Sequence, residues 1–202
     1  EQGQERRQQL LDAAERLFAK RGFDQTRIAD ICDEAGVAKG LFYWYFDTKQ
    51  ALFADLVRSV RQQLRRAQAA AMDDTADPIT RLCQGGRASV RFMADHMEFF
   101  ALVRDVGRDA DREGSIAPVL AESAEIYIAD IVRLIEKAQA DGLIGSDRDP
   151  RLLALAVQST VSSFAGFGRH GVVSASVDEL AEFVAAWLER ALRDRPLGST
   201  GR

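Results

Sequence analysis

The chain has little cysteine, histidine and proline, and no long apolar run. Its two cysteines, Cys32 and Cys83, stand far apart and offer neither a metal-ligand spacing nor a disulfide framework, so we expect a reducing cytoplasm. The longest unbroken aliphatic run, residues 152–157, is far shorter than the ~20 residues that cross a bilayer, and the first nine residues lack the apolar core of a secretion signal. With two histidines and no glycine-rich phosphate loop, the sequence also predicts no enzyme, no metal site and no cofactor.

Helical patterning runs along almost the whole chain instead. Apolar residues recur at three- and four-residue spacing, and glycine and proline fall where helices would end. The sequence predicts an all-α fold of about nine helices, near residues 5–21, 27–34, 38–45, 49–71, 78–94, 97–106, 116–141, 150–168 and 176–194. We expect helix caps from Thr26, Thr48, Asp77, Asp149 and the Ser176–Glu179 capping box.

The expected organisation is a small head followed by a larger body. The head covers residues 1–50 and the helical body residues 51–195, while the tail over 196–202 is expected to be disordered. Within the body, Gly85-Gly86 is expected to kink its helix, and the charged stretch 107–115 to form a surface loop.

Charge gives little guidance about partners. The net charge is −4, although residues 1–66 carry 12 Lys and Arg against 10 Asp and Glu. A nucleic-acid-binding head needs a basic face rather than a basic total, so this balance neither supports nor excludes one.

The segment over residues 26–52 is the most informative part of the chain. It reads as two short helices joined by a tight turn at Ala35-Gly36-Val37, and the second helix carries the aromatic block 42–46. Two helices around such a turn are how proteins offer a helix to the major groove of double-stranded DNA. The segment therefore predicts a helix-turn-helix DNA-binding head.

The order of residues in this head resembles the tetracycline-repressor-like (TetR) family of transcriptional regulators. The resemblance is specific over about residues 6–53, and its matching positions are Thr26, Ile31, Ala35, Gly36, Val37, Gly40, Phe42, Tyr43, Tyr45, Phe46, Lys49 and Leu52. It implies a sequence-specific DNA-binding repressor that acts as a homodimer on a palindromic operator and is released by a small-molecule effector. Ala38, Leu41 and Cys32 depart from the residues usual in the family, and we expect Cys32 to be a packed small hydrophobe.

The residues expected to contact DNA lie on and around the second helix of this motif. Phe42 and Phe46 are expected to be core, but three consecutive aromatic residues cannot all be buried by one helix, so at least one must face outward. The resemblance implies that Tyr45 and Lys49 contact the DNA backbone. Whether Arg6 and Arg7 reach DNA is left open. The full set of candidates is Arg27, Lys39, Gly40, Leu41, Tyr43, Trp44, Tyr45 and Lys49.

The last two helices carry broad apolar stripes, which the resemblance assigns to a dimer interface. A two-fold dimer would present two recognition helices to half-sites roughly 34–36 Å apart. Alternatively, the stripes only pack inside one subunit. The interface candidates are Leu153, Val157, Val161, Phe164, Leu180, Phe183, Val184, Trp187 and Leu188.

The resemblance also implies an effector cavity in the body. Most of its candidate residues could equally be ordinary core, and their apolar and aromatic bias favours a hydrophobic or aromatic effector. They are Phe92, His96, Phe99, Phe100, Val103, Arg104, Leu120, Tyr127, Ile131, Phe164 and Phe167. A second hypothesis remains, in which the chain is a helical small-molecule-binding or carrier protein without specific DNA binding.

Overall fold

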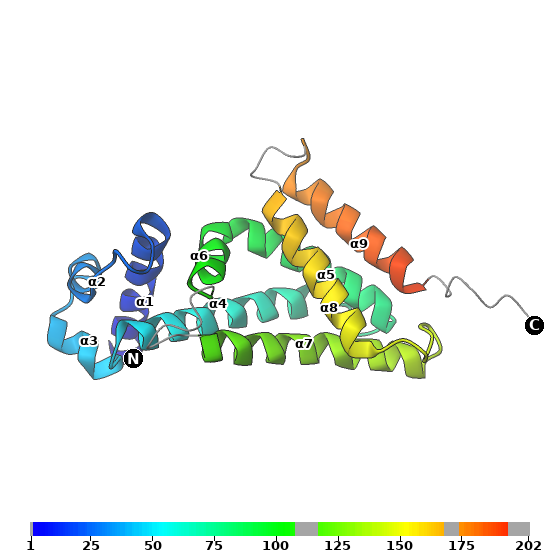
Figure 1. The fold of residues 1–202 in the computed structure, drawn as a ribbon, viewed down its shortest axis with the longest axis horizontal. Helices are drawn as coiled ribbons and strands as arrows, with labels where there is room; N and C mark the ends of the chain where they lie inside the picture. The colour runs from blue at the N-terminus through cyan, green and yellow to red at the C-terminus, as the bar shows by residue number, and fades with distance from the viewer. Residues whose placement is uncertain (1, 108–116, 168–173, 194–202) are drawn as a thin grey trace, which may run out of the picture. The chain divides into compact units, whose positions relative to one another are not determined.

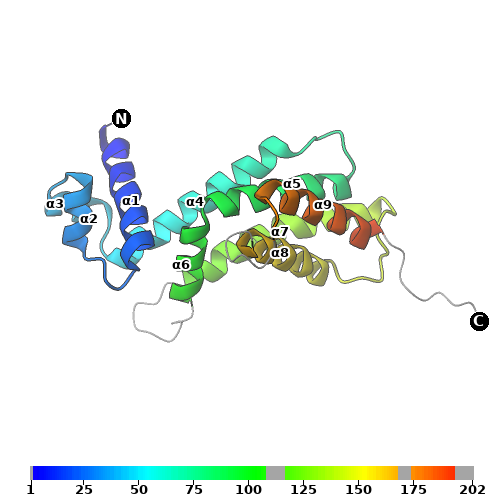
Figure 2. The same ribbon diagram turned by 90° about the horizontal axis from the view of Figure 1, so that it is seen from above.

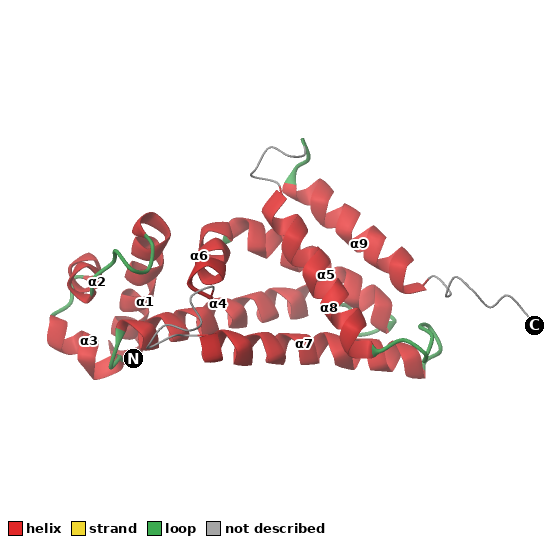
Figure 3. Cartoon of the chain, in the orientation of Figure 1, coloured by secondary structure: helices red, strands yellow, loops and turns green. Residues whose placement is uncertain are grey.

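The computed structural model describes residues 2–107, 117–167 and 174–193, and this part of the chain forms nine α-helices and no strand (Figures 1 and 3). The all-α prediction is therefore confirmed. Of the loop expected over 107–115, Gly107 is the last residue of α6, and residues 108–115 lie outside the described residues, as does the expected tail over 196–202. The helices are α1 (Gln2–Arg21), α2 (Ile28–Ala35), α3 (Lys39–Tyr45), α4 (Lys49–Ala71), α5 (Pro78–Asp95), α6 (Met97–Gly107), α7 (Ala117–Ala140), α8 (Pro150–Phe167) and α9 (Val177–Arg193).

Most of the predicted helix caps are present. The Asp77 carboxylate accepts hydrogen bonds from the backbone N–H groups of Ile79 and Thr80, and Thr48 Oγ1 accepts one from Ala51. Asp149 caps α8 in the same way, and the Ser176–Glu179 capping box forms at the start of α9. None of the described helices is both long and apolar enough to cross a membrane.

Thr26 does not cap α2, so this prediction was wrong. Its side chain is fully buried, and its hydroxyl donates to the carbonyl oxygen of Gly22 at 2.9 Å. The helix starts at Ile28, and the residue before it, Arg27, donates its backbone N–H to the Asp30 carboxylate at 2.9 Å. The hydroxyl therefore bonds to the residue that follows α1 and not to the backbone N–H groups at the start of α2.

The chain divides into two compact units, of which the first contains residues 1–62 and 98–123. α2 packs between α1 and α3. The rings of Phe18, Phe23 and Phe53 pack against one another with centroids 5.2–5.5 Å apart, and Phe53 also lies 6.5 Å from Phe99 of α6. Because α6 contributes to this aromatic cluster, the contacts divide the chain differently from the predicted boundary at residue 50.

The second unit contains residues 63–97 and 124–202, and its core forms around α5. Both α8 and α9 pack against α5, as the two ribbon views show (Figures 1 and 2). Gly85 and Gly86 lie inside a continuous helix and do not end it. A Cβ on Gly86 would stand 3.1 Å from Leu188 Cδ1, so this glycine allows α9 to approach closely, and the expected kink stays a prediction.

Ion pairs attach α9 to α5 near both of its ends. Near its start, Asp178 and Glu182 pair with Arg91, and Glu182 also pairs with Arg87. At its end, Arg193 donates to the Asp77 carboxylate at 2.8 Å. Partial burial raises the pKa of Asp77, but hydrogen bonds from Thr80 and Arg193 outweigh it and lower the pKa to about 2, against an ordinary 3.8.

This ion pair predicts a specific loss of stability in acid. Because the pKa of Asp77 is lower in the folded chain, its contribution is complete above pH ~4 and is lost as the pH falls toward 2. We expect about 1 kcal/mol after solvent screening. Urea titrations at pH 5 and pH 2.5 should show this difference between the wild type and Asp77→Asn, which keeps an N-capping side chain. An identical pH dependence in both proteins would contradict the assignment.

Candidate DNA-binding surface and effector pocket

The turn between α2 and α3 has the geometry that the sequence predicts. Gly36 adopts φ 65° and ψ 35°, a left-handed conformation that side chains with a Cβ rarely adopt. The backbone N–H of Val37 donates to the Cys32 carbonyl at 3.0 Å and ends α2. Cys32 is buried, and this burial raises the pKa of its thiol, which agrees with a packed small hydrophobe.

The two faces of α3 separate clearly. Phe42 and Phe46 are buried, as predicted, and their ring centroids lie 5.8 Å apart. On the other face, Trp44 is 81% exposed and Tyr43 is 49% exposed. Lys39 and Gly40 are also exposed, while Leu41 and Tyr45 are half-buried. The buried rings fix the orientation of α3 in its unit, so the helix presents cationic and aromatic groups to solvent.

The remaining DNA-contact candidates differ in accessibility. The Arg27 side chain is largely exposed and pairs only at 3.5 Å with Asp30. The Lys49 ammonium instead donates to backbone carbonyls of the loop between α1 and α2. Its expected contact with a DNA phosphate stays a prediction.

Arg7 has an internal role in the head. It forms an ion pair with Asp55 of α4, which also pairs with Arg58, and its guanidinium lies 5.5 Å from the centroid of the Phe46 ring. These contacts join the start of α1 to α4 and to the end of α3. The Arg6 side chain is exposed and donates to Gln9 at 3.0 Å.

Much of the predicted dimer interface lies inside the subunit's own core, and this part of the prediction needs correction. Five of the predicted residues pack in the core around α5 and leave almost no surface for a partner. They are Val157, Val161, Leu180, Val184 and Leu188. Leu153 and Phe164 are half-buried. Phe183 and Trp187 remain available at 54% and 47% exposed, and Leu152 and Leu155 are exposed on α8. The apolar stripes of α8 and α9 are broad because each covers two faces of its helix, and one of these faces packs against α5.

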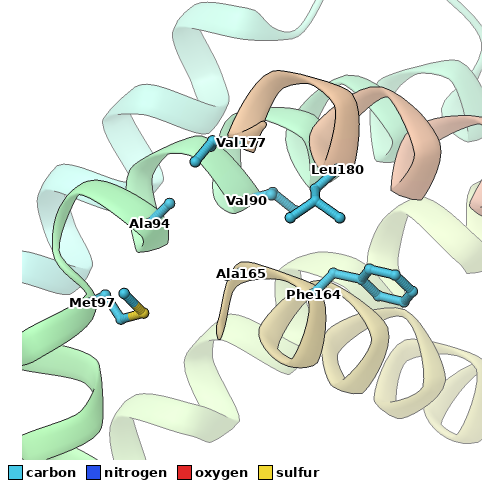
Figure 4. A pocket seen from close by; sticks show the side chains of 7 residues that line it. All are labelled: Val90, Ala94, Met97, Phe164, Ala165, Val177 and Leu180. Atoms are coloured by element: carbon cyan, nitrogen blue, oxygen red, sulfur yellow. The ribbon is translucent and has the colours of Figure 1, made fainter. Parts of the chain in front are cut away.

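An apolar pocket of about 120 Å³ opens between α5, α8 and α9 (Figure 4). Only Phe164 belongs to the predicted effector set; Leu180 was a dimer candidate, and sequence reasoning missed the others. No signal in the sequence separates small apolar pocket residues from ordinary core. The lining residues are Val90, Ala94, Met97, Phe164, Ala165, Val177 and Leu180.

The other effector candidates do not line this pocket. The His96 ring stacks on Phe92 with centroids 4.1 Å apart, and Tyr127 accepts a hydrogen bond from Gln68 at 3.0 Å. Ile131 is buried core of the second unit. The Phe167 side chain lies outside the described residues. The candidates that belong to the first unit are Phe99, Phe100, Val103, Arg104 and Leu120, and Arg104 is exposed.

No cluster of three or more His, Cys, Asp or Glu that could hold a metal ion occurs among the described residues. The candidate functional features are therefore an exposed recognition helix and an apolar pocket.

Comparisons with known proteins agree with this geometry. Residues 10–56 match the family model of "Bacterial regulatory proteins, tetR family". The chain is 41% identical over 80 residues to the HTH-type transcriptional regulator TtgR of Pseudomonas putida (strain DOT-T1E), covering 39% of this chain and 38% of TtgR. It is 26% identical over 172 residues to the HTH-type transcriptional repressor BepR of Brucella suis biovar 1 (strain 1330), covering 83% and 82% of the two chains.

The fold also has relatives among solved structures. The transcriptional regulator FadR of Bacillus subtilis, in complex with stearoyl-CoA, superposes with a TM-score of 0.77 at 20% identity, over 90% of this chain and 96% of FadR. At this identity the likeness concerns the fold alone. The match with TtgR spans little more than a third of the length of that regulator. Over residues 10–56, the chain is therefore similar to the TetR family of bacterial regulatory proteins.

Proposed function

We propose that this protein is a cytoplasmic, homodimeric DNA-binding transcriptional regulator, a repressor that a small hydrophobic effector releases from its operator. The observation that carries the proposal is the arrangement of α3. This helix follows the left-handed turn at Gly36, and it buries Phe42 and Phe46 while its opposite face is exposed. The TetR-family match over residues 10–56 supports a regulator over the carrier hypothesis, in which α3 would be only a packing module.

The exposed face of α3 offers complementary chemistry to a DNA groove. Lys39 is long enough to donate to a guanine edge or a phosphate, and Gly40 lets the helix approach the duplex closely. Tyr43 can donate to a phosphate, and the Trp44 ring can contact sugars and thymine methyl groups. Half-buried Leu41 offers a further apolar contact at the edge of this face.

A two-fold dimer would form through the outer faces of α8 and α9. Phe183, Trp187, Leu152 and Leu155 supply exposed apolar side chains on these two neighbouring helices. Aromatic residues are enriched at the buried centre of protein interfaces, which supports this assignment. A palindromic operator follows from the symmetry of such a dimer.

The pocket between α5, α8 and α9 supports a hydrophobic effector. All seven lining residues are apolar, so an uncharged or alkyl portion of a ligand would fit there. FadR of B. subtilis, which shares the fold, is seen with stearoyl-CoA, whose acyl portion has this character. At about 120 Å³ the pocket holds only part of such a molecule. An effector would act through its difference in affinity for the DNA-bound and released conformations.

Selection of bound duplexes from a random DNA pool tests this function. We expect a palindromic site to be enriched, and Lys39→Ala to weaken binding to it about 10- to 100-fold while relaxing the preference at one base position. Lys20→Ala, which removes an exposed lysine at the end of α1, is the charge-matched control. A folded wild type that enriches no sequence after ligand has been stripped by refolding would favour the carrier hypothesis.

A further inference from the structure

Lys49 contacts the loop between α1 and α2. Its ammonium donates to the carbonyl oxygens of Phe23 at 2.6 Å, Thr26 at 2.8 Å and Asp24 at 3.4 Å. The same nitrogen lies 4.3 Å from the centroid of the Phe23 ring, within the range of a cation–π interaction. One side chain of α4 therefore contacts three residues of this loop.

These contacts give the Lys49 ammonium several backbone acceptors within its own unit. An ammonium carries three N–H groups, and three carbonyl oxygens lie within hydrogen-bonding distance of it. Lys49 is also the first residue of α4, where a positive charge is unfavourable because the helix N-terminus is itself positive. The carbonyl oxygens offset this unfavourable interaction in the free protein. A DNA phosphate would offset it only when DNA is bound.

The loop that Lys49 holds determines where α2 begins. Phe23 packs between Phe18 of α1 and Phe53 of α4, with both centroid distances 5.2 Å. Thr26 is fully buried and bonded to Gly22, and α2 starts two residues after it. Since α2 packs against α3, a displaced loop would move the recognition helix relative to the rest of its unit.

We infer that Lys49 is a positioning residue, which sustains DNA binding by fixing the loop over residues 22–27 rather than by contacting a phosphate. The inference rests on the proposed DNA-binding function and names a residue that sets the geometry of that site. It reassigns a lysine for which the family resemblance implies a contact with the DNA backbone.

The salt dependence of operator binding separates the two roles. Each lost phosphate contact lowers the slope of log affinity against log salt concentration by about 0.9. We expect Lys49→Met, which keeps the aliphatic stem, to raise the Kd about tenfold with an unchanged slope, because it removes donors from two partly buried carbonyl oxygens. Lys39→Ala serves as the comparison for the loss of a charge that faces DNA. A slope lowered by about 0.9 in Lys49→Met would overturn the inference.

A second variant tests the same loop without changing charge. Phe23→Leu removes the ring beneath the ammonium, so it should also weaken binding at an unchanged slope. The double variant should lose less binding free energy than the two single variants lose in total, because both substitutions disrupt the same loop. Fully additive losses would show that Lys49 acts independently of the loop, which contradicts the inference.

Amide hydrogen exchange provides a test that needs no DNA. Lys49→Met should exchange faster in α2, including the Ile31 amide that donates to the Arg27 carbonyl at 3.2 Å, while α5 keeps wild-type protection. Unchanged exchange in α2 would overturn the inference. A wild type that binds no DNA would refute the proposed function instead, and the exchange experiment would still decide the role of Lys49.

Discussion

Replacing Trp187 with glutamate is expected to convert the proposed dimer into monomers and to weaken operator binding by about 100-fold or more, because two linked heads gain that much from binding together. Trp187 is about half exposed on α9, beside Phe183 of the preceding turn, so a partner would bury its ring. Burying an unpaired carboxylate in an apolar interface carries a large desolvation cost. Sedimentation velocity gives the assembly state, and a titration with operator DNA gives the affinity.

The control for this experiment is another exposed apolar side chain outside α8 and α9. Ile126 of α7 is as exposed as Trp187, so Ile126→Glu adds the same charge to a similar surface of the second unit. It should leave both the assembly state and DNA affinity unchanged. If Trp187→Glu stays dimeric, the interface does not involve the outer face of α9.

Truncating Phe42 to alanine is expected to unfold the helix-turn-helix and to abolish specific DNA binding. Phe42 is fully buried and packs against the rings of Phe46 and Tyr43. Removing a buried phenylalanine side chain costs about 3–5 kcal/mol, which is a large part of the stability of a small unit. NMR spectra should lose the dispersed signals of α2 and α3 while the signals of α8 and α9 persist.

Tyr43→Ala provides the matched comparison, because it truncates the neighbouring aromatic residue on the exposed face. We expect it to keep nearly wild-type stability and to weaken DNA binding, so stability and affinity change separately in the two variants. Equal destabilisation by both substitutions would mean that the two faces of α3 are not distinct.

The sequence predicts the helices and most of their caps because these features depend on neighbouring residues. Asp77 accepts the N–H groups two and three positions ahead, and Ser176 exchanges hydrogen bonds with Glu179 three positions on. The turn at Gly36 and the inward-facing Phe42 follow from equally local signals. Helix caps and turns can therefore be predicted from the spacing of residues in the sequence.

The incorrect or missing assignments concern contacts between distant residues. Thr26 bonds to carbonyls four and nine positions earlier, and Lys49 reaches back 23 to 26 positions. Apolar spacing showed that α8 and α9 are amphipathic, but it could not show that α5 covers Val157 and Val184 while Phe183 stays exposed. Helical periodicity identifies an apolar face without identifying what packs on it.

The division of α3 into a buried and an exposed face bears on how proteins with such a helix-turn-helix diversify. Ala38 gives the helix no side-chain cap, so its orientation depends on Phe42 and Phe46 rather than on the residues that face solvent. Exchanging Lys39, Tyr43 or Trp44 should therefore change which operator is read with little effect on folding. Duplicated copies of such a gene could acquire new targets through a few substitutions, and the same exposed positions are the natural ones to randomise in engineering altered specificity.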